Sequence, residues 1–222
     1  TKALVDIASV YYESGAIDEA HSWLMKISEN DRSMSYERDK ILVSIYQKQG
    51  NMEKLTELRF QQFRSHPSIE RLQELLDIVG AEQREKIVND ETAVILDRTE
   101  FRASDVDFLV SVEKIDEAES YIVKNAETID GQFYTSLLDL AEKMTSKKRS
   151  LAATLIYRPL LVSILERGYS KAYTYGVRYL RILDKLSKAV SSWKNFDSHE
   201  IFKNQIYLNH KRKRSFWSKY EM

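Results

Sequence analysis

The sequence predicts an all-α fold, and three observations lead to that prediction. Glycine and proline are scarce, at 6 and 2 of 222 residues, which argues against the many turns of an all-β fold. Apolar residues recur at helical spacing and are interrupted by Gly15 and Gly50. These two glycines are 35 residues apart, as are Tyr11 and Tyr46. We therefore expect antiparallel helix pairs that recur along the chain.

The first predicted pair spans residues 4–27, LVDIASVYYESGAIDEAHSWLMKI. Ala8 and Ala20 place one small residue on each helix, where two helices approach each other closely. The second predicted pair spans residues 40–67 and ends at Pro67, because proline cannot continue a helix. Each pair turns at one of the two glycines.

Both pairs resemble a tetratricopeptide repeat, a family with a period of about 34 residues, small residues on both helices and a terminal proline. In the second pair, Val43 and Leu55 stand where small residues are usual. A third, weaker match covers residues 108–130, with Glu113 at the turn, and residues 68–100 predict one or two shorter helices between them. The resemblance implies a tetratricopeptide-like α-solenoid of antiparallel helix pairs with a capping C-terminal helix, a fold that usually binds peptides or proteins.

Two long apolar helices are predicted in the second half of the chain. Residues 150–168 form a strongly apolar stretch that Ser150 is expected to cap at its start and Gly168 at its end. Pro159 is expected to kink this helix by removing one hydrogen bond. Residues 169–193 keep an apolar stripe at helical spacing, formed by Tyr173, Val177, Leu180, Leu183 and Leu186.

A last helix is expected from about residue 198 to near the C-terminus, with Asp197 or Ser198 as its cap. Residues 150–217, with AATLIYRPLLVSILERGYSKAYTYGVRYL and the final HKRKRSFW, resemble an uncharacterised bacterial helical family. That family is sometimes found downstream of SWIM-type zinc modules, whose cysteines this chain lacks. The resemblance implies a defined C-terminal motif but no activity.

The net charge of zero conceals two oppositely charged parts of a single expected domain, residues 1–222. Residues 1–142 contain 16 Lys and Arg against 29 Asp and Glu, whereas residues 143–222 contain 18 against 5. Either the two parts attract each other, or the array has two differently charged ends, or the basic part binds an anionic partner.

Nothing in the sequence predicts an enzyme, a cofactor or a metal site. Cysteine is absent, which excludes a thiol nucleophile and a thiolate zinc site. His199 and His210 would lie about 16 Å apart along one helix, too far to share a metal. No signal peptide and no membrane-spanning stretch is visible, so we expect a cytoplasmic protein. The start at Thr1 suggests a fragment of a longer protein.

Arg158 is a candidate binding residue because it lies inside an apolar helix beside Pro159. A carbonyl freed by the proline could accept from its guanidinium. The guanidinium could instead pair with Asp139 or Glu142 on the preceding helix. The alternative is a buried arginine that faces a groove and binds an anionic ligand.

Tyr175, Arg178 and Tyr179 form a second candidate surface, within a cluster that also holds Tyr169, Tyr173 and Arg181. Aromatic rings interleaved with arginines could stack on bases and bind phosphates. They could equally be packing residues whose hydroxyls reach solvent.

The basic run of the C-terminal tail is the third candidate, and it comprises Lys211, Arg212, Lys213 and Arg214. These cations are expected on a helix whose following Phe216 and Trp217 dock back on earlier helices, near Lys185, Lys188 or Lys194. The letters also match a nuclear-localisation signal. Taken together, the sequence predicts a non-enzymatic scaffold that binds a protein or peptide, with nucleic-acid binding by the basic part as the alternative.

Overall fold

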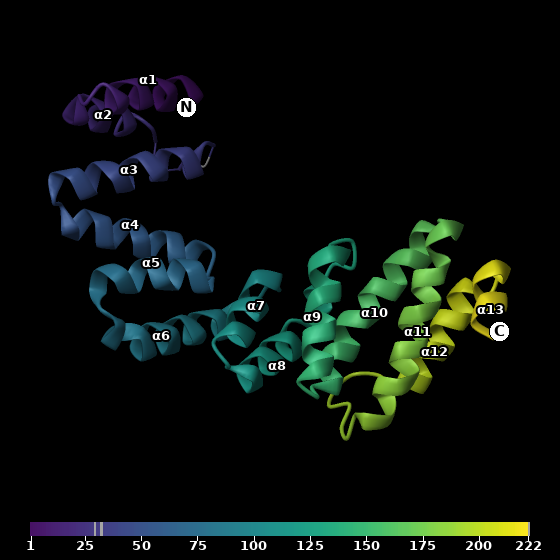
Figure 1. Cartoon of the computed structure of the whole chain (residues 1–222). Coiled ribbons are helices and arrows are strands. Elements are labelled where there is room, and N and C mark those ends of the chain that lie inside the picture. Colours follow the sequence, from purple (N-terminus) through teal and green to yellow (C-terminus); the bar gives the residue numbers. More distant parts are fainter. Residues whose placement is uncertain (29, 32, 222) are drawn as a thin grey trace. The chain divides into compact units, whose positions relative to one another are not determined.

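The computed structural model describes residues 1–28, 30–31 and 33–221, and the expected all-α fold is confirmed (Figure 1). Thirteen α-helices and four short 3-10 helices (η) lie in these residues, and no strand does. They are α1 (Lys2–Glu13), α2 (Ile17–Leu24), α3 (Ser35–Gln49), α4 (Met52–Ser65), α5 (Ile69–Val79), η1 (Ala81–Gln83), α6 (Arg84–Asp97), α7 (Ala103–Ser111), α8 (Ile115–Lys124), η2 (Ala126–Thr128), α9 (Tyr134–Ser146), α10 (Ser150–Arg167), η3 (Ser170–Ala172), α11 (Tyr173–Leu186), η4 (Ser187–Ala189), α12 (His199–His210) and α13 (Arg214–Glu221). Among the described helices, none combines the length and the apolar character that crossing a membrane requires.

The chain divides into two compact units, Thr1–Ile87 and Val88–Met222. The boundary falls inside α6. The change from acidic to basic sequence, after residue 142, falls inside α9 and therefore within the second unit. The two oppositely charged parts of the sequence are thus not the two units of the structure.

One form of helix-to-helix turn occurs in both units. Its central residue has a positive φ, at Gly15 (87°), Gly50 (64°), Glu113 (61°) and Lys148 (60°). The next residue donates its N–H to the carbonyl five residues earlier, as in Ala16 to Tyr11, Asn51 to Tyr46, Lys114 to Leu109 and Arg149 to Met144. This is the Schellman arrangement that ends many helices. Glu113 and Lys148 are 35 residues apart, the same interval that separates the two glycines.

Each of these turns is flanked by two buried apolar residues, seven positions before it and five after it. They are Ala8 and Ala20, Val43 and Leu55, Val106 and Ala118, and Ala141 and Ala153. Small side chains at both positions let the helices of a pair approach closely. The pair α9–α10 therefore fits the pattern better than the second predicted pair does, although the sequence alone did not single it out, because a lysine stands at its turn.

The core of the first unit lies between its successive helices. Consecutive helices pack on one another from α1 to α5. A cluster of buried side chains joins α1, α2, α3 and α4: Val5, Ala8, Ala20, Leu24, Ile27, Leu42, Val43, Ile45, Tyr46, Leu55 and Leu58. The two shorter helices expected between residues 68 and 100 are α5 and α6.

The core of the second unit is built around α10, which packs on α9 and α11 on its two sides (Figure 1). Most of its residues are buried, so it is apolar around its whole circumference rather than along one stripe. The helix runs through Pro159 without a break in its assignment and ends before Gly168 (φ 68°), the expected end. The backbone of Gly131 passes so close to Pro159 that a Cβ on this glycine would lie 2.0 Å from the proline carbonyl oxygen.

Two details of the second half differ from the sequence prediction. Ser150 is the first residue of α10 and not its cap, because Arg149 holds the cap position without a side-chain hydrogen bond. The predicted last helix is two helices, α12 and α13, separated by a turn at Lys211 and Arg212. The expected cap of α12 is confirmed, since the Ser198 hydroxyl accepts from the N–H of Ile201.

Candidate functional site

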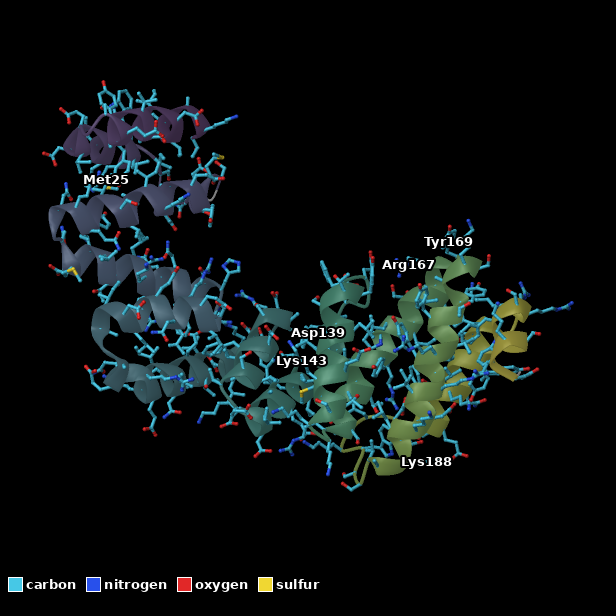
Figure 2. The ribbon with its side chains drawn as sticks, in the orientation of Figure 1. Met25, Asp139, Lys143, Arg167, Tyr169 and Lys188 are labelled. Carbon is cyan, nitrogen blue, oxygen red and sulfur yellow. The ribbon has the colours of Figure 1, made fainter. Side chains whose placement is uncertain are left out.

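Several basic residues just after residue 142 pair with acidic residues that precede them in the sequence. Lys143 contacts Asp107 at 2.5 Å and Asp139 at 2.8 Å, the latter one helical turn away on α9 (Figure 2). Lys147 contacts Glu113 at 3.3 Å. All these pairs lie within the second unit, so its oppositely charged parts attract each other. That interpretation of the charge pattern therefore accounts for the cations closest to the boundary.

Arg149 and Arg178 extend the same set of ion pairs. Arg149 pairs with Asp116 and, at 3.3 Å, with Glu119. Arg178 pairs more loosely with Glu142, at 3.7 Å, and both side chains are more than half exposed. Arg178 and three cations farther along the chain, Arg181, Lys185 and Lys219, line the candidate site.

The C-terminal helix α13 docks on α11 through aromatic residues, as the sequence predicted for Phe216 and Trp217. Phe216 is fully buried and Trp217 is 9% exposed. The ring of Phe216 meets Tyr173 of α11 edge to face, with centroids 5.7 Å apart. The Trp217 indole N–H donates to the carbonyl of His210 at 3.0 Å. Burial of such rings holds the last helix in place.

A cluster of polar side chains around Asp184 also holds α13 in place. Lys203 donates to Asp184 at 2.9 Å and to the Tyr220 hydroxyl at 2.5 Å, and that hydroxyl donates to Asp184 at 2.5 Å. His199 Nε2 lies 2.8 Å from the same carboxylate. Burial works to raise the pKa of Asp184, but these three partners hold it below its usual value. The pKa of Lys203 is raised, because its bonds to Tyr220 and Asp184 outweigh its burial.

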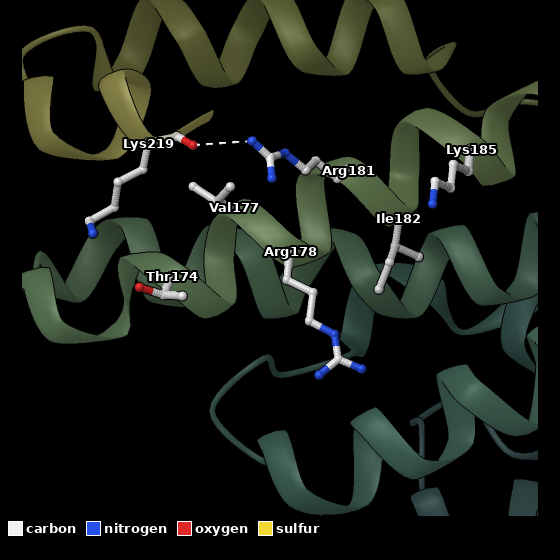
Figure 3. Close-up of a pocket in the computed structure, with 7 residues that line it drawn as sticks. All are labelled: Thr174, Val177, Arg178, Arg181, Ile182, Lys185 and Lys219. Carbon is white, nitrogen blue, oxygen red and sulfur yellow. Dashed lines mark hydrogen bonds between the residues drawn. The ribbon is translucent and has the colours of Figure 1, made fainter. Parts of the chain in front are cut away.

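Between α11 and α13 lies a groove of roughly 620 Å³, which we call the α11–α13 groove (Figure 3). The described residues that line it are Thr174, Val177, Arg178, Arg181, Ile182, Lys185 and Lys219. Four of the seven are cations, and none is acidic or aromatic. Val177 and Ile182 give the groove an aliphatic floor, to which the hydrocarbon stems of the cations add apolar surface.

The cations of the groove differ in what already binds them. Arg181 donates to the carbonyls of Lys219 and Tyr220, at 3.3 and 3.1 Å, and so caps the end of α13. Arg178 reaches away from α13 (Figure 3), and its contact with Glu142 is the loose pair described above. Lys185 and Lys219 have no carboxylate within 4.0 Å among the described residues. The groove therefore holds positive charge that other described side chains do not neutralise.

The three candidate residues on α11 have different environments. Tyr175 is 59% exposed and Arg178 lines the groove. Tyr179 is 5% exposed and packs on Tyr157, with ring centroids 5.7 Å apart. Burial raises the pKa of Tyr157 to about 12. Tyr179 is thus a packing residue, whereas Tyr175 remains available beside the groove.

Arg158 lies outside the groove and is buried. Its guanidinium lies over the rings of Trp193 and Phe202, 5.0 and 4.6 Å from their centroids, and donates to the carbonyl of Asp197 at 2.8 Å. Burial lowers its pKa to about 10. Neither expected carboxylate partner binds it, because Asp139 and Glu142 pair with Lys143 and Arg178 instead. Both expected pairs are therefore wrong.

The basic run Lys211, Arg212, Lys213 and Arg214 occupies the turn between α12 and α13 and the start of α13, not the end of a continuous helix. The ammonium group of Lys213 lies close to Gly168, at the end of α10. None of the four lines the α11–α13 groove, to which α13 contributes Lys219 instead. The run and the groove are separate cationic features.

A second groove, of roughly 770 Å³, crosses α2, α3 and α4 of the first unit, with Met25 on its rim (Figure 2). Its cations are largely neutralised, since Arg38 pairs with Asp39 at 3.0 Å and Lys54 with Glu57 at 2.9 Å. This groove therefore offers less charge selectivity than the one on α11 and α13. In neither unit do the described His, Asp and Glu side chains gather in threes that could hold a metal ion.

Sequence reasoning grouped Arg178 with Arg181 but identified neither Lys219 nor the groove itself. Lys219 and Arg181 meet only because α13 folds back on α11, and the break between α12 and α13 carries no proline or glycine to signal it. The cluster of Asp184, Lys203 and Tyr220 was missed for the same reason. Its members are separated by up to 36 residues in the sequence.

The model of a family of unknown function (DUF6880) matches residues 2–219, almost the whole chain. Neither a curated protein nor a solved structure matches the chain significantly.

Proposed function

We propose that this chain, which belongs to the DUF6880 family of unknown function, is a non-enzymatic scaffold that binds a partner protein. The observation that supports this function is the α11–α13 groove, with its aliphatic floor and with Lys185 and Lys219, which have no carboxylate partner among the described residues. Such a surface suits a segment that presents apolar and acidic side chains together. The docking of α13 forms one wall of the groove.

We further propose that the scaffold is a tetratricopeptide-like α-solenoid. Four turns of one form support this proposal, and the two turns of each unit are 35 residues apart. The buried residues that flank these turns support it as well. Repeat arrays of this kind stack helix pairs and need a polar cap at the end. α13 would act as that cap.

A photo-crosslinking amino acid at Thr174 tests the binding function. Thr174 is exposed and lines the groove, and Lys188 is an equally exposed control position outside it (Figure 2). In a lysate of the source organism, a protein adduct should form at Thr174 and be absent at Lys188. Equal labelling at both positions, or labelling of RNA instead of protein at Thr174, contradicts the proposal.

The second candidate is a nucleic-acid-binding accessory domain, and exposed aromatic residues favour it. Tyr134 and Tyr175 are 55% and 59% exposed, and both lie near Tyr179, with Arg178 beside them. Labelled single- and double-stranded nucleic acids test it by fluorescence anisotropy at about 50 and 200 mM salt. This function predicts binding that weakens by orders of magnitude over that range, whereas the scaffold predicts no binding even at the lower salt.

A further inference from the structure

We infer that the partner of the α11–α13 groove is the acidic face of an amphipathic helix, which lies along α11. This inference rests on the proposed scaffold function and names the chemistry of its partner. Its evidence is the spacing of the cations, the nature of the groove floor and the pairing of the other charges in the unit.

The cations of α11 form a stripe with helical spacing. Arg178, Arg181 and Lys185 stand at positions i, i+3 and i+7, so they share one face of the helix and extend over about 10 Å of its axis. A partner helix with acidic residues at i, i+4 and i+7 presents carboxylates at the same two intervals in the reverse order. Lys219 adds a fourth positive charge from the other wall.

The floor of the groove favours a peptide over a nucleic acid. It is formed by Val177, Ile182 and the methyl group of Thr174, and no aromatic ring lines it. Bases bind single-strand sites by stacking on aromatic rings, and Tyr175, the exposed ring on the same helix, is outside the groove lining. Leucine or isoleucine side chains of an amphipathic helix fit an aliphatic floor, as in other complexes that place a helix in a groove.

A second copy of this chain is a poorer occupant than a different protein. Several acidic residues of the unit are already paired within it, as Asp107 is with Lys143 and Glu113 with Lys147. To occupy the groove of another copy, they would have to break these pairs. Within the groove, Lys185 and Lys219 have no carboxylate partner among the described residues and Arg178 holds Glu142 only loosely, so these three cations can meet a partner, whereas Lys143, Lys147 and Arg149 join the helices of the unit.

A designed peptide tests the inference with the full chain. The probe is a fluorescein-labelled helical peptide of about 18 residues, long enough to be helical in water, with glutamates at i, i+4, i+7 and i+11 and leucines beside them. The comparison probes are a peptide of the same composition with its glutamates spread around the helix, and a labelled oligonucleotide of about 12 bases. Fluorescence anisotropy gives the affinity of each.

Two double variants locate the binding site. R178E/K185E reverses two charges of the groove, and K188E/K194E makes the same change in net charge at exposed lysines that do not line it. We expect the striped peptide to bind best, and R178E/K185E to weaken it about tenfold or more relative to K188E/K194E, since two attractions become repulsions. Circular dichroism checks that both variants stay helical.

The outcomes separate this inference from the proposed function. If both peptides bind equally, or both double variants weaken binding equally, the charge stripe does not select the partner and the inference fails. If the peptides fail while crosslinks to a protein still form at Thr174, the scaffold function stands with a partner of another chemistry. If only the oligonucleotide binds and R178E/K185E abolishes that binding, both proposals fail. If the wild-type chain self-associates and R178E/K185E does not, a second copy of the chain occupies the groove, and this result also overturns the inference.

Discussion

The two units build the same helix turn with different residues. In the first unit the positive φ falls on Gly15 and Gly50, whereas in the second it falls on Glu113 and Lys148. A residue with a Cβ is strained in this conformation by about 1 kcal/mol. The first unit therefore encodes its turns locally, and the second must hold them by contacts made elsewhere.

Contacts between distant residues are what distinguish the second unit. Gly131 fits against Pro159, Lys147 reaches Glu113 in the turn before α8, Arg149 reaches Asp116 on α8, and Tyr220 binds Asp184. The ion pairs are half exposed and individually weak. The close approach of backbones and the burial of aromatic rings contribute more, so substitutions at those positions test the comparison most strongly.

Gly131→Ala should have the largest effect. The added Cβ would lie 2.0 Å from a backbone oxygen that cannot move without shifting α10. We expect the free energy of unfolding, measured by urea denaturation, to fall by more than about 4 kcal/mol, in the range of the most damaging single substitutions.

Gly15→Ala is the matched control for this change. It has open space around the new Cβ and carries only the strain of its φ of 87°. Its cost should be about 1 kcal/mol. Similar losses for the two variants would show that the approach of Gly131 to Pro159 does not hold the second unit together.

Phe216→Ala should follow, with a loss of about 3 to 4 kcal/mol, because it empties a fully buried ring position. It should also release α13 and with it one wall of the groove. Hydrogen exchange of the amides of α13 measures this release directly. Protection that stays unchanged while stability falls would mean that the polar cluster alone holds the helix.

The contrast between the units also explains what the sequence could predict. The helical fold, the turn at Glu113, the burial of Phe216 and Trp217 and the cap at Ser198 follow from periodicity and local turn chemistry, and the structure confirms them. The partners of Arg158 were predicted wrongly, because they come from the segment before α12 and from α12 itself, 35 residues or more away, rather than from the preceding helix.

The candidate site was predictable only in part for the same reason. Arg178 was found because aromatic and basic residues alternate around it in the sequence. Lys219 and the aliphatic floor were not, because the groove exists only after α13 folds back across α11. One-dimensional spacing describes a single helix face, but a groove requires two helices.

Tyr220→Phe should have a smaller and pH-dependent effect. It removes a hydroxyl that donates to Asp184 and accepts from Lys203, and we expect a loss of about 1 to 2 kcal/mol near pH 7. The pKa of Asp184 is lowered from 3.8, so its contribution disappears as pH falls below that value. The pKa values of Tyr220 and Lys203 are raised from 10.0 and 10.5, so the contributions of these two groups to stability disappear as the pH rises above their raised pKa values.

The difference in stability between the wild type and Tyr220→Phe should therefore be largest from about pH 5 to 9 and shrink at both ends. Urea denaturation from about pH 3 to about pH 11, which extends beyond both ends of this range, measures it. A difference that is constant with pH would show that the hydroxyl acts only by packing.

Lys148→Gly should raise stability, because it relieves the strain of a side chain at φ 60°. The gain should be about 1 kcal/mol, as large as the loss in Gly15→Ala. Lys148→Gly places a glycine at a turn of the second unit, whereas Gly15→Ala removes one from a turn of the first unit. A loss of stability in Lys148→Gly, measured in the same urea experiment, would mean that the lysine side chain contributes more than its backbone strain costs.

Arg158→Met should change stability least, by less than about 1 kcal/mol in either direction. The guanidinium is buried, and burial lowers its pKa to about 10, so the charge is a cost to folding that one hydrogen bond and two rings offset. A methionine keeps the contact with Trp193 and Phe202 and removes that cost. Arg158→Ala, which also leaves a cavity, should lose about 2 to 3 kcal/mol. If both variants lost that much, the charge itself would stabilise the loop that carries Trp193, and the second unit would depend on a buried cation as well as on the approach of its backbones.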